Sequence, residues 1–90
     1  MILGRVCGTV VSSVQHPFYA GRKQLIVCAT TPDGSLDENR YVIAVDMVGA
    51  GIGQTVLVQD EGNSARQMIG VKDAPVRSLI VAIVDEVAGE

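Results

Sequence analysis

The sequence contains no tryptophan, and only Phe18, Tyr19 and Tyr41 carry aromatic rings, which is 3% of the chain. Clustered charge is also missing: seven Lys and Arg residues stand against ten Asp and Glu residues, for a formal net charge of −3. Proteins that bind nucleic acids usually present a basic face and aromatic side chains on which bases stack. The composition therefore argues against a nucleic-acid partner.

Long apolar segments are absent as well. No run approaches the roughly 20 residues that span a bilayer, and the N-terminus lacks the charged and apolar regions of a signal peptide. We therefore expect a cytoplasmic protein with no membrane partner. Cys7 and Cys28 lie in apolar, strand-like segments without CxxC spacing. In a reducing compartment the simplest interpretation is two reduced, buried residues, with a disulfide or a catalytic thiol as the less favoured alternative.

The sequence shows no recognisable nucleophile–base pair and no cluster of metal ligands. The single histidine, His16, precedes a proline in an expected loop, and no second metal ligand accompanies it. An enzyme that uses Cys7 or Cys28 with His16 would need a reactive, accessible thiolate, whereas both cysteines lie in apolar runs. We predict that the protein is not an enzyme and has no cofactor and no metal.

What the sequence does contain is apolar and small: the chain has 90 residues, of which 48% are hydrophobic and ten are glycine. This length predicts a single domain, residues 1–90. A domain of this size buries only roughly 60–65% of its unfolded surface and is marginally stable alone. The high apolar share therefore suggests that other subunits cover part of the surface.

Five segments have the length and β-branched content of strands, namely residues 2–13, 25–30, 40–46, 55–60 and 78–87. Residues 14–23 and 32–39 are expected to be connections. Ser64 and Gln67 fit a capping box and Gly70 a stop signal, which predicts one or two helical turns between the fourth and fifth strands. This order predicts an all-β fold, a small five-stranded, partly closed antiparallel barrel of the OB type. Its expected core includes Val6, Val10, Ile26, Ile43, Val56, Leu57, Ile80 and Ile83.

Glycine occupies every second position in the connection between the third and fourth strands, at Gly49, Gly51 and Gly53. Such spacing indicates unusual backbone angles or the close approach of another group. A nucleotide-binding loop would lead into a helix whose N-terminus holds a phosphate. This loop leads into a strand, which favours a structural or subunit-contact role. We expect a positive φ or a tight contact between subunits at Gly51.

Five segments, in order, resemble one known family along nearly the whole chain: GRVCGTVVSS, HPFYAGRKQLIV, AVDMVGAGIGQTVLV, NSARQ, and DAPV followed by IVAIVDEV. The family is EutN/CcmL, the vertex proteins of carboxysomes and other bacterial microcompartments. The resemblance implies an OB-like barrel and a structural shell protein, a homopentamer that caps vertices among hexameric shell proteins. One departure is Gln54, where an acidic residue is common. The alternative function is an OB-type nucleic-acid-binding module.

The resemblance also implies which residues form the subunit interface: Gly49, Gly51, Gly53, Ser64, Ala65 and Arg66. The competing interpretations are an ordinary glycine-rich connection within one barrel and a solvated arginine on a short helix. Asp46 and Asp85 each close an apolar strand. They are either partners of Arg5 or Arg66 or, more simply, strand-end carboxylates.

Overall fold

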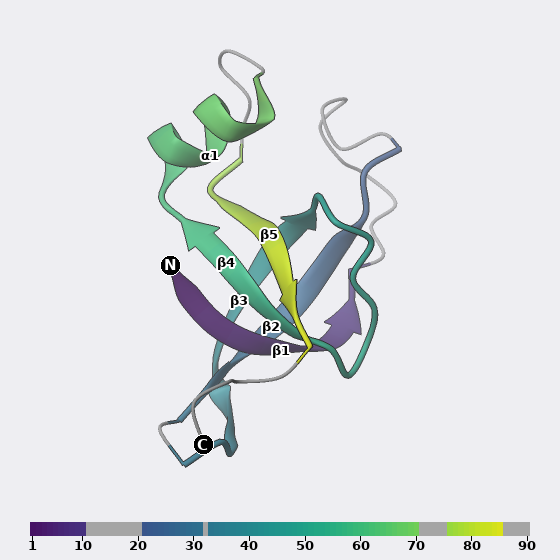
Figure 1. Cartoon of the computed structure of the whole chain (residues 1–90), viewed down its shortest axis with the longest axis vertical. Coiled ribbons are helices and arrows are strands. Elements are labelled where there is room, and N and C mark those ends of the chain that lie inside the picture. The colour runs from purple at the N-terminus through teal and green to yellow at the C-terminus, as the bar shows by residue number, and fades with distance from the viewer. Residues whose placement is uncertain (11–20, 32, 71–75, 86–90) are drawn as a thin grey trace.

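The chain folds into a closed five-stranded barrel with one short helix. The structure is a computed structural model, and it describes residues 1–10, 21–31, 33–70 and 76–85. Within these residues the elements are β1 (Ile2–Thr9), β2 (Gln24–Thr30), β3 (Leu36–Asp46), β4 (Thr55–Asp60), α1 (Gly62–Ile69) and β5 (Ser78–Val84). The strands pair in the order β1-β2-β3-β5-β4, and β4 pairs again with β1 (Figure 1). The predicted OB-like barrel, with its helix between the fourth and fifth strands, is confirmed.

Two details of the predicted barrel are wrong: it is closed rather than partly closed, and one of its strand pairs is parallel. Val45 of β3 pairs with Leu79 of β5, and Asp46 with Ile80, in parallel register, while the other four pairs are antiparallel. The reason is geometric. A ring with an odd number of strands cannot alternate direction all the way round, so closure of five strands requires a parallel neighbour.

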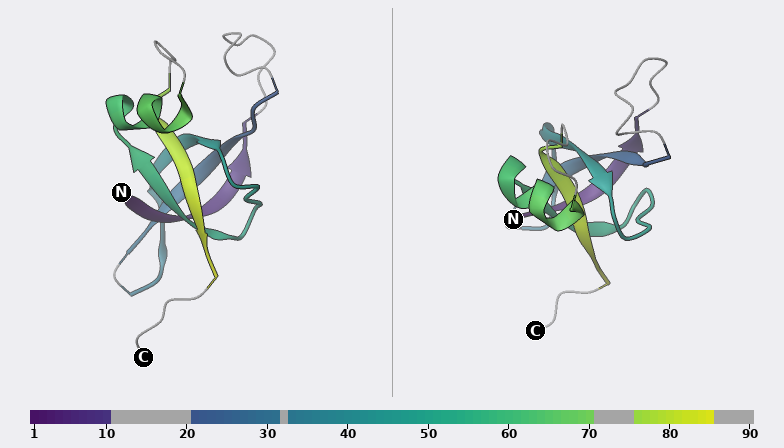
Figure 2. Two further views of the ribbon diagram at one scale, coloured as in Figure 1. Left: turned by 45° about the horizontal axis from the view of Figure 1, so that its top comes forward. Right: turned by 90° about the horizontal axis from the view of Figure 1, so that it is seen from above.

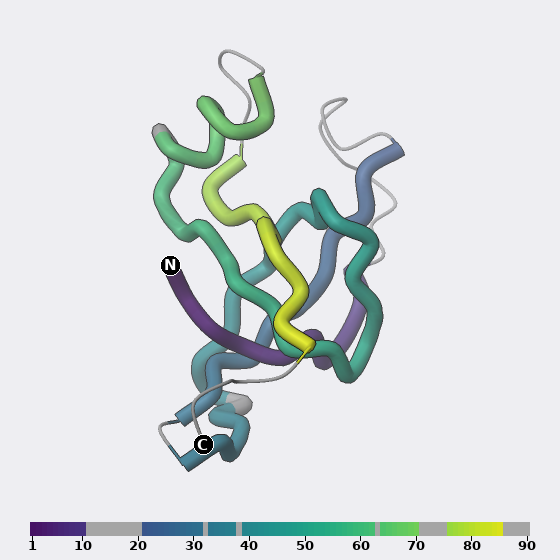
Figure 3. Tube along the Cα trace, in the orientation of Figure 1, coloured from purple at the N-terminus to yellow at the C-terminus, as the bar shows by residue number. Residues whose placement is uncertain are grey.

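The strand boundaries agree with the prediction most closely at β4, which matches residues 55–60. The prediction is wrong for residues 36–39, which were expected in a connection but begin β3, where Leu36 pairs with Thr30 and Asp37 with Ala29. A register shift after Cys28 accommodates the extra residues of β3. As a result, the β2–β3 hairpin extends beyond the barrel, at the bottom of Figure 3. Residues 11–13 of the first predicted strand, most of the loop 14–23 and the end of the fifth strand lie outside the described residues.

The core consists of small branched side chains that point inward from every strand. One cluster fills the barrel, and a second lies between α1 and the strands β3 and β5, with Val45, Ala65, Val76 and Leu79 fully or nearly buried. The predicted core is confirmed at Val6, Val56 and Ile80. It is wrong at Ile43, whose side chain is 49% exposed, because the neighbouring Ala44 faces inward. Successive residues of a strand face opposite sides of the sheet, and the larger of two neighbouring apolar residues is not always the one that faces the core.

Helix α1 begins one turn earlier than the predicted capping box requires. The carboxylate of Glu61 accepts hydrogen bonds from the backbone N–H of Ser64, at 3.1 Å, and from the Ser64 hydroxyl, while the Glu61 carbonyl accepts the first helical bond from Ala65. Glu61 therefore caps the helix, and the capping role assigned to Ser64 is wrong. The predicted stop is confirmed: Gly70 has a φ of 75° and donates to the Arg66 carbonyl at 2.9 Å.

Gly4 leaves no room for a side chain between β1 and β2 and yields a prediction about stability. A Cβ atom at Gly4 would lie 2.6 Å from the carbonyl oxygen of Cys28, whereas one at Gly8 would come no closer than 3.4 Å to the Ile26 side chain. We expect Gly4→Ala to lower the free energy of unfolding by roughly 1–3 kcal/mol, as overpacking that moves backbone does. The matched control Gly8→Ala should change it by less than about 0.5 kcal/mol. Urea unfolding of both variants measures the difference, and equal stabilities would contradict it.

Candidate subunit-contact site

The residues that the sequence assigns to a subunit interface occupy two places in the fold. Residues 47–54 form the glycine loop, which connects β3 to β4, and the others lie on α1. The glycine loop and α1 project from opposite sides of the barrel in Figure 1 and in both views of Figure 2. A protomer built in this way has two distinct surfaces that can face two different neighbours.

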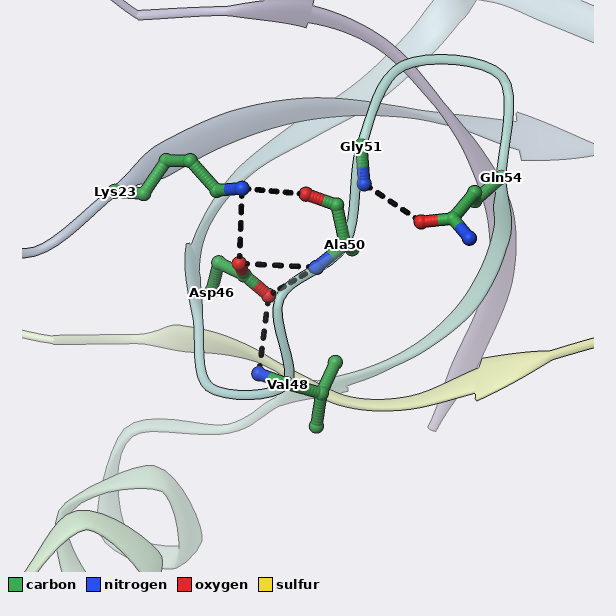
Figure 4. A network of polar contacts seen from close by, with 6 residues as sticks. All are labelled: Lys23, Asp46, Val48, Ala50, Gly51 and Gln54. Carbon is green, nitrogen blue, oxygen red and sulfur yellow. Dashed lines mark hydrogen bonds and ion pairs between the residues drawn. The ribbon is translucent and has the colours of Figure 1, made fainter.

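Asp46, the last residue of β3, organises the glycine loop (Figure 4). Its carboxylate accepts hydrogen bonds from the backbone N–H groups of Val48 and Ala50, each at 3.1 Å, and forms an ion pair with Lys23 Nζ at 3.3 Å. The same ammonium group donates to the Ala50 carbonyl at 2.6 Å. The Asp46 side chain is only 4% exposed, whereas that of Lys23 is 50% exposed. The ion pair thus connects the first turn of the loop to the chain just before β2.

The environment of Asp46 also stabilises its ionised form. Burial by itself would raise the pKa of this carboxyl, but the hydrogen bonds from Ala50 and Val48 and the neighbouring Lys23 outweigh burial and lower the pKa below its ordinary value. The simpler of the two interpretations, a strand-end carboxylate, is therefore incomplete for Asp46. The Asp46 carboxylate forms an ion pair with Lys23, which the sequence analysis did not predict as its partner. Asp85 follows β5 on the exposed surface, as expected of a strand-end residue.

The second half of the glycine loop is joined to β1. Gln54 accepts a hydrogen bond from the Gly51 N–H through its side-chain oxygen at 2.7 Å, and Gly53 donates to the Val6 carbonyl at 2.8 Å. Together with the bonds to Asp46 and the bonds from the N–H groups of Met47 and Gln54 to backbone carbonyls, six amides of the loop have acceptors within the chain: Met47, Val48, Ala50, Gly51, Gly53 and Gln54. A phosphate-binding loop needs such amides pointed at its ligand. The geometry therefore agrees with the rejection of a nucleotide site.

The unusual backbone angles fall on the outer two glycines rather than on Gly51. Gly49 has a φ of 80° and Gly53 a φ of 92°, while Gly51 is absent from the positive-φ glycines of the described residues. Of the two alternatives expected at Gly51, the tight contact between subunits stays a prediction, and the positive φ is thus wrong. The physical reason is the turn that closes at Gln54, whose N–H donates to the Gly51 carbonyl at 3.2 Å: Gly51 opens this turn, and Gly53 takes its left-handed position.

This assignment of angles predicts unequal effects of alanine at two glycines that are two positions apart. Gly53→Ala should lower the free energy of unfolding by roughly 1–2 kcal/mol, the cost of a left-handed conformation for a residue with a Cβ. Gly51→Ala should be neutral or slightly stabilising, because a Cβ there would lie 3.8 Å from its nearest neighbour, the Gln54 side-chain oxygen. Thermal unfolding of the two variants distinguishes them. A larger loss for Gly51→Ala would contradict the assignment.

The glycine loop presents apolar side chains to solvent. Met47, Val48 and Ile52 are 44%, 40% and 67% exposed, although the adjacent Ala50 is completely buried. Three large apolar side chains within six residues form a surface that gains free energy when another molecule covers it. This feature fits a contact role for the loop, because solvent-facing connections are usually polar.

Helix α1 presents two of the three predicted interface residues. Ala65 is completely buried within its own chain, in the cluster with Val45 and Leu79, so its side chain is not available to a neighbour. Ser64 and Arg66 are partly exposed on either side of it. The Arg66 guanidinium lies over Gly62, with one nitrogen 3.2 Å from the point where a Cβ would project. Ala65 therefore fixes the helix against the barrel, and its neighbours along the chain are presented outward.

The cysteines contradict the sequence interpretation. Cys7 and Cys28 are joined by a disulfide between β1 and β2, with their Cα atoms 6.3 Å apart, within the range of natural disulfides. Cys28 is 4% exposed, as expected, but Cys7 is exposed. The two cysteines are 21 residues apart, and this spacing is no sequence signal for a disulfide. Only the register between β1 and β2 brings the two positions together. A bonded pair offers no free thiolate, and His16 lies outside the described residues.

The described residues contain no group of three or more His, Cys, Asp and Glu side chains placed to hold a metal ion. Among them, too, no helix has the length and apolar character needed to cross a membrane.

Comparison with known proteins shows the family of this chain. The family described as "Ethanolamine utilisation protein EutN/carboxysome" matches residues 1–85. The bacterial microcompartment shell vertex protein GrpN of Rhodospirillum rubrum is 42% identical over 91 residues, which cover 97% of this chain and 96% of GrpN. The structure of Gloeobacter violaceus CcmL aligns with a TM-score of 0.86 at 38% identity, covering 100% of this chain and 91% of that one. The pentameric shell protein structure of R. rubrum GrpN aligns with a TM-score of 0.81 at 37% identity, covering 100% and 99%.

Proposed function

The chain belongs to the EutN/CcmL family, and from this membership we propose that it is a structural shell protein that forms homopentamers and caps the vertices of a bacterial microcompartment. The observation that carries the proposal is the correspondence along almost the entire chain with a pentameric shell protein. Relatives with the same correspondence include a carboxysome shell vertex protein, CcmL of Nostoc. The place of action is the microcompartment shell in the bacterial cytoplasm.

The function follows from symmetry rather than from chemistry. A flat layer of hexagonal units cannot close on itself, and replacing some six-fold positions by five-fold ones introduces the curvature that closes it. A cyclic pentamer supplies such a position when its head-to-tail contact closes after five copies. We propose hexameric shell proteins as the neighbours of this pentamer. In this account no side chain performs catalysis, and the single domain, residues 1–90, acts as a building block.

A head-to-tail contact requires two different surfaces on each protomer, and we propose that the glycine loop and α1 are these surfaces. The loop contributes Gly49, Gly51 and Gly53 with the exposed Met47, Val48 and Ile52. The helix contributes Ser64 and Arg66, placed by the buried Ala65, and the adjacent Met68 is 50% exposed. Their location on opposite sides of the barrel supports this arrangement, because a ring passes from one side of each protomer to the other.

The alternative function, an OB-type nucleic-acid-binding module, is not supported. The curated relatives carry the names of shell vertex proteins. The net charge of −3 and the few aromatic residues also disfavour it.

Shell closure tests the proposal directly. The hexameric shell proteins of the same microcompartment are produced with and without this chain, and the products are imaged by electron microscopy. We expect closed polyhedral shells when the chain is present, and open sheets, tubes or shells with gaps when it is omitted. Equally closed shells in both preparations would contradict a vertex function.

A further inference from the structure

The disulfide between Cys7 and Cys28 has no part in the proposed shell function, and its position differs from that of a buried structural bond. The two cysteines lie on the outer face of the barrel, beside Ile26, Tyr41 and Ile43. Tyr41 and Ile43 are 59% and 49% exposed, so solvent reaches this face. Cys7 is itself exposed, whereas Cys28 is 4% exposed. One sulfur of the pair is therefore open to a reagent and the other is shielded.

The strands on which the cysteines lie are held together independently of the disulfide. Antiparallel pairs connect β1 to β2 on both sides of the bond, among them Val6 with Val27 and Thr9 with Leu25. Cys7 falls at the register shift between Val6 and Gly8, so it is the unpaired residue of an irregularity in β1. The Cys7 sulfur also lies 3.5 Å from the Ile26 carbonyl oxygen, which a free Cys7 thiol would have as an acceptor. The bond can thus open and close without separation of the strands.

We propose that Cys7 and Cys28 form a reversible thiol–disulfide exchange site for small-molecule thiols and disulfides, with Cys7 as the exchanging sulfur and Cys28 as the resolving one. Exchange requires in-line access to a sulfur, and this pair offers access at Cys7 alone. At the cytoplasmic location proposed above, lasting structural disulfides are rare, and those that form usually exchange with the thiol pool. The site does not depend on pentamer formation, because exchange is measurable in any oligomeric state.

The oxidation of the reduced pair balances with a small disulfide such as oxidised glutathione. The Cys7 thiolate attacks one sulfur of the reagent, the S–S bond of the reagent breaks, and one glutathione leaves and takes up a proton. The Cys28 thiolate then attacks the Cys7 sulfur of the mixed disulfide, and the second glutathione leaves and is protonated in turn. Two electrons pass from the cysteine pair to the reagent, and reduction by two thiols is the reverse.

Two single variants of the full chain separate the roles of the sulfurs. In Cys28→Ala, exposure to oxidised glutathione should accumulate a mixed disulfide at Cys7, because no resolving sulfur remains. In Cys7→Ser, the remaining Cys28 should react on the order of tenfold or more slowly, because exchange rates follow access to the sulfur. Reduced wild-type protein should instead form the intramolecular disulfide and carry almost no adduct. Intact mass spectrometry of samples quenched with acid follows all three reactions.

Circular dichroism of the three proteins verifies that the barrel is folded, and alanine at position 28 avoids a new buried polar group. If Cys28→Ala does not fold, Cys28→Ser is a second trapping variant, because it also lacks the resolving sulfur. The proposal is overturned if reduced wild type forms no disulfide with oxidised glutathione. It is also overturned if both single variants acquire the adduct at equal rates, because Cys7 would then have no privileged role.

Discussion

Replacing Arg66 by alanine is expected to shift the pentamer toward monomers while the barrel stays folded. In the proposed ring the planar guanidinium reaches a carboxylate or carbonyl group of the next protomer. Removal of one partner from a desolvated polar contact costs roughly 2–5 kcal/mol. The same loss occurs at every contact of a cyclic ring, so the effect on assembly is larger than the loss at a single contact.

Arg66→Lys keeps the charge but loses the two-pronged geometry, and we expect it to preserve assembly only in part. Arg77→Ala is the matched control, because the Arg77 side chain is 78% exposed and its Nε pairs with Asp60 of the same chain at 3.2 Å. Sedimentation velocity across micromolar concentrations measures the distribution of species, and circular dichroism confirms folding. An intact pentamer after Arg66→Ala would remove this residue from the interface.

Replacing Asp46 by alanine is expected to destabilise the glycine loop and, through it, the ring. Two backbone amides, those of Val48 and Ala50, lose a charged acceptor, and such bonds contribute roughly 1.5–3 kcal/mol each. Lys23 is half-exposed, so water can solvate its ammonium group, and we place the net loss of unfolding free energy at about 3 kcal/mol. Urea unfolding measures it. Asp85→Ala removes an exposed carboxylate after another strand and should change stability by less than about 0.5 kcal/mol.

The lowered pKa of Asp46 adds a pH dependence of known sign. A carboxyl whose pKa is lower in the folded state stabilises the fold fully above its unfolded value of 3.8, and the stabilisation is lost as the pH falls through the folded value. Wild type should therefore lose more stability than Asp46→Ala when the pH is taken from neutral to below 3.8. Thermal unfolding of both proteins over this range tests the prediction, and parallel pH profiles would contradict it.

The sequence predicted the barrel because its strands are rich in β-branched residues and are separated by segments with turn residues. Residues 55–60 are the clearest case: β-branched residues between polar turns predicted β4 to the residue. The patterns failed where long-range register decides the outcome. The disulfide depends on β1 meeting β2 with a shift at Cys7, and the Lys23–Asp46 pair joins residues on either side of a hairpin. Ile43 shows the same limit, because hydrophobicity alone did not reveal which side of β3 faces inward.

The candidate site was predictable in outline only. Glycine spacing located the loop, but the turn at Gln54 decided which glycines adopt positive φ. The expected capping box and the stop signal at Gly70 located the helix, but only the packing of α1 showed that Ala65 points inward while Ser64 and Arg66 remain accessible. Residue types thus predicted which segments make up the candidate site, and the three-dimensional arrangement determined which of their side chains are exposed.

The stoichiometry of the native assembly tests the central claim most directly. Native mass spectrometry of the wild-type chain at micromolar concentration is expected to give a dominant species of five chains, with no significant tetramer or hexamer, because the head-to-tail contact closes at one rotation. A dominant monomer, dimer or six-membered ring under these conditions would contradict the proposal that this protein supplies the five-fold vertices of a shell.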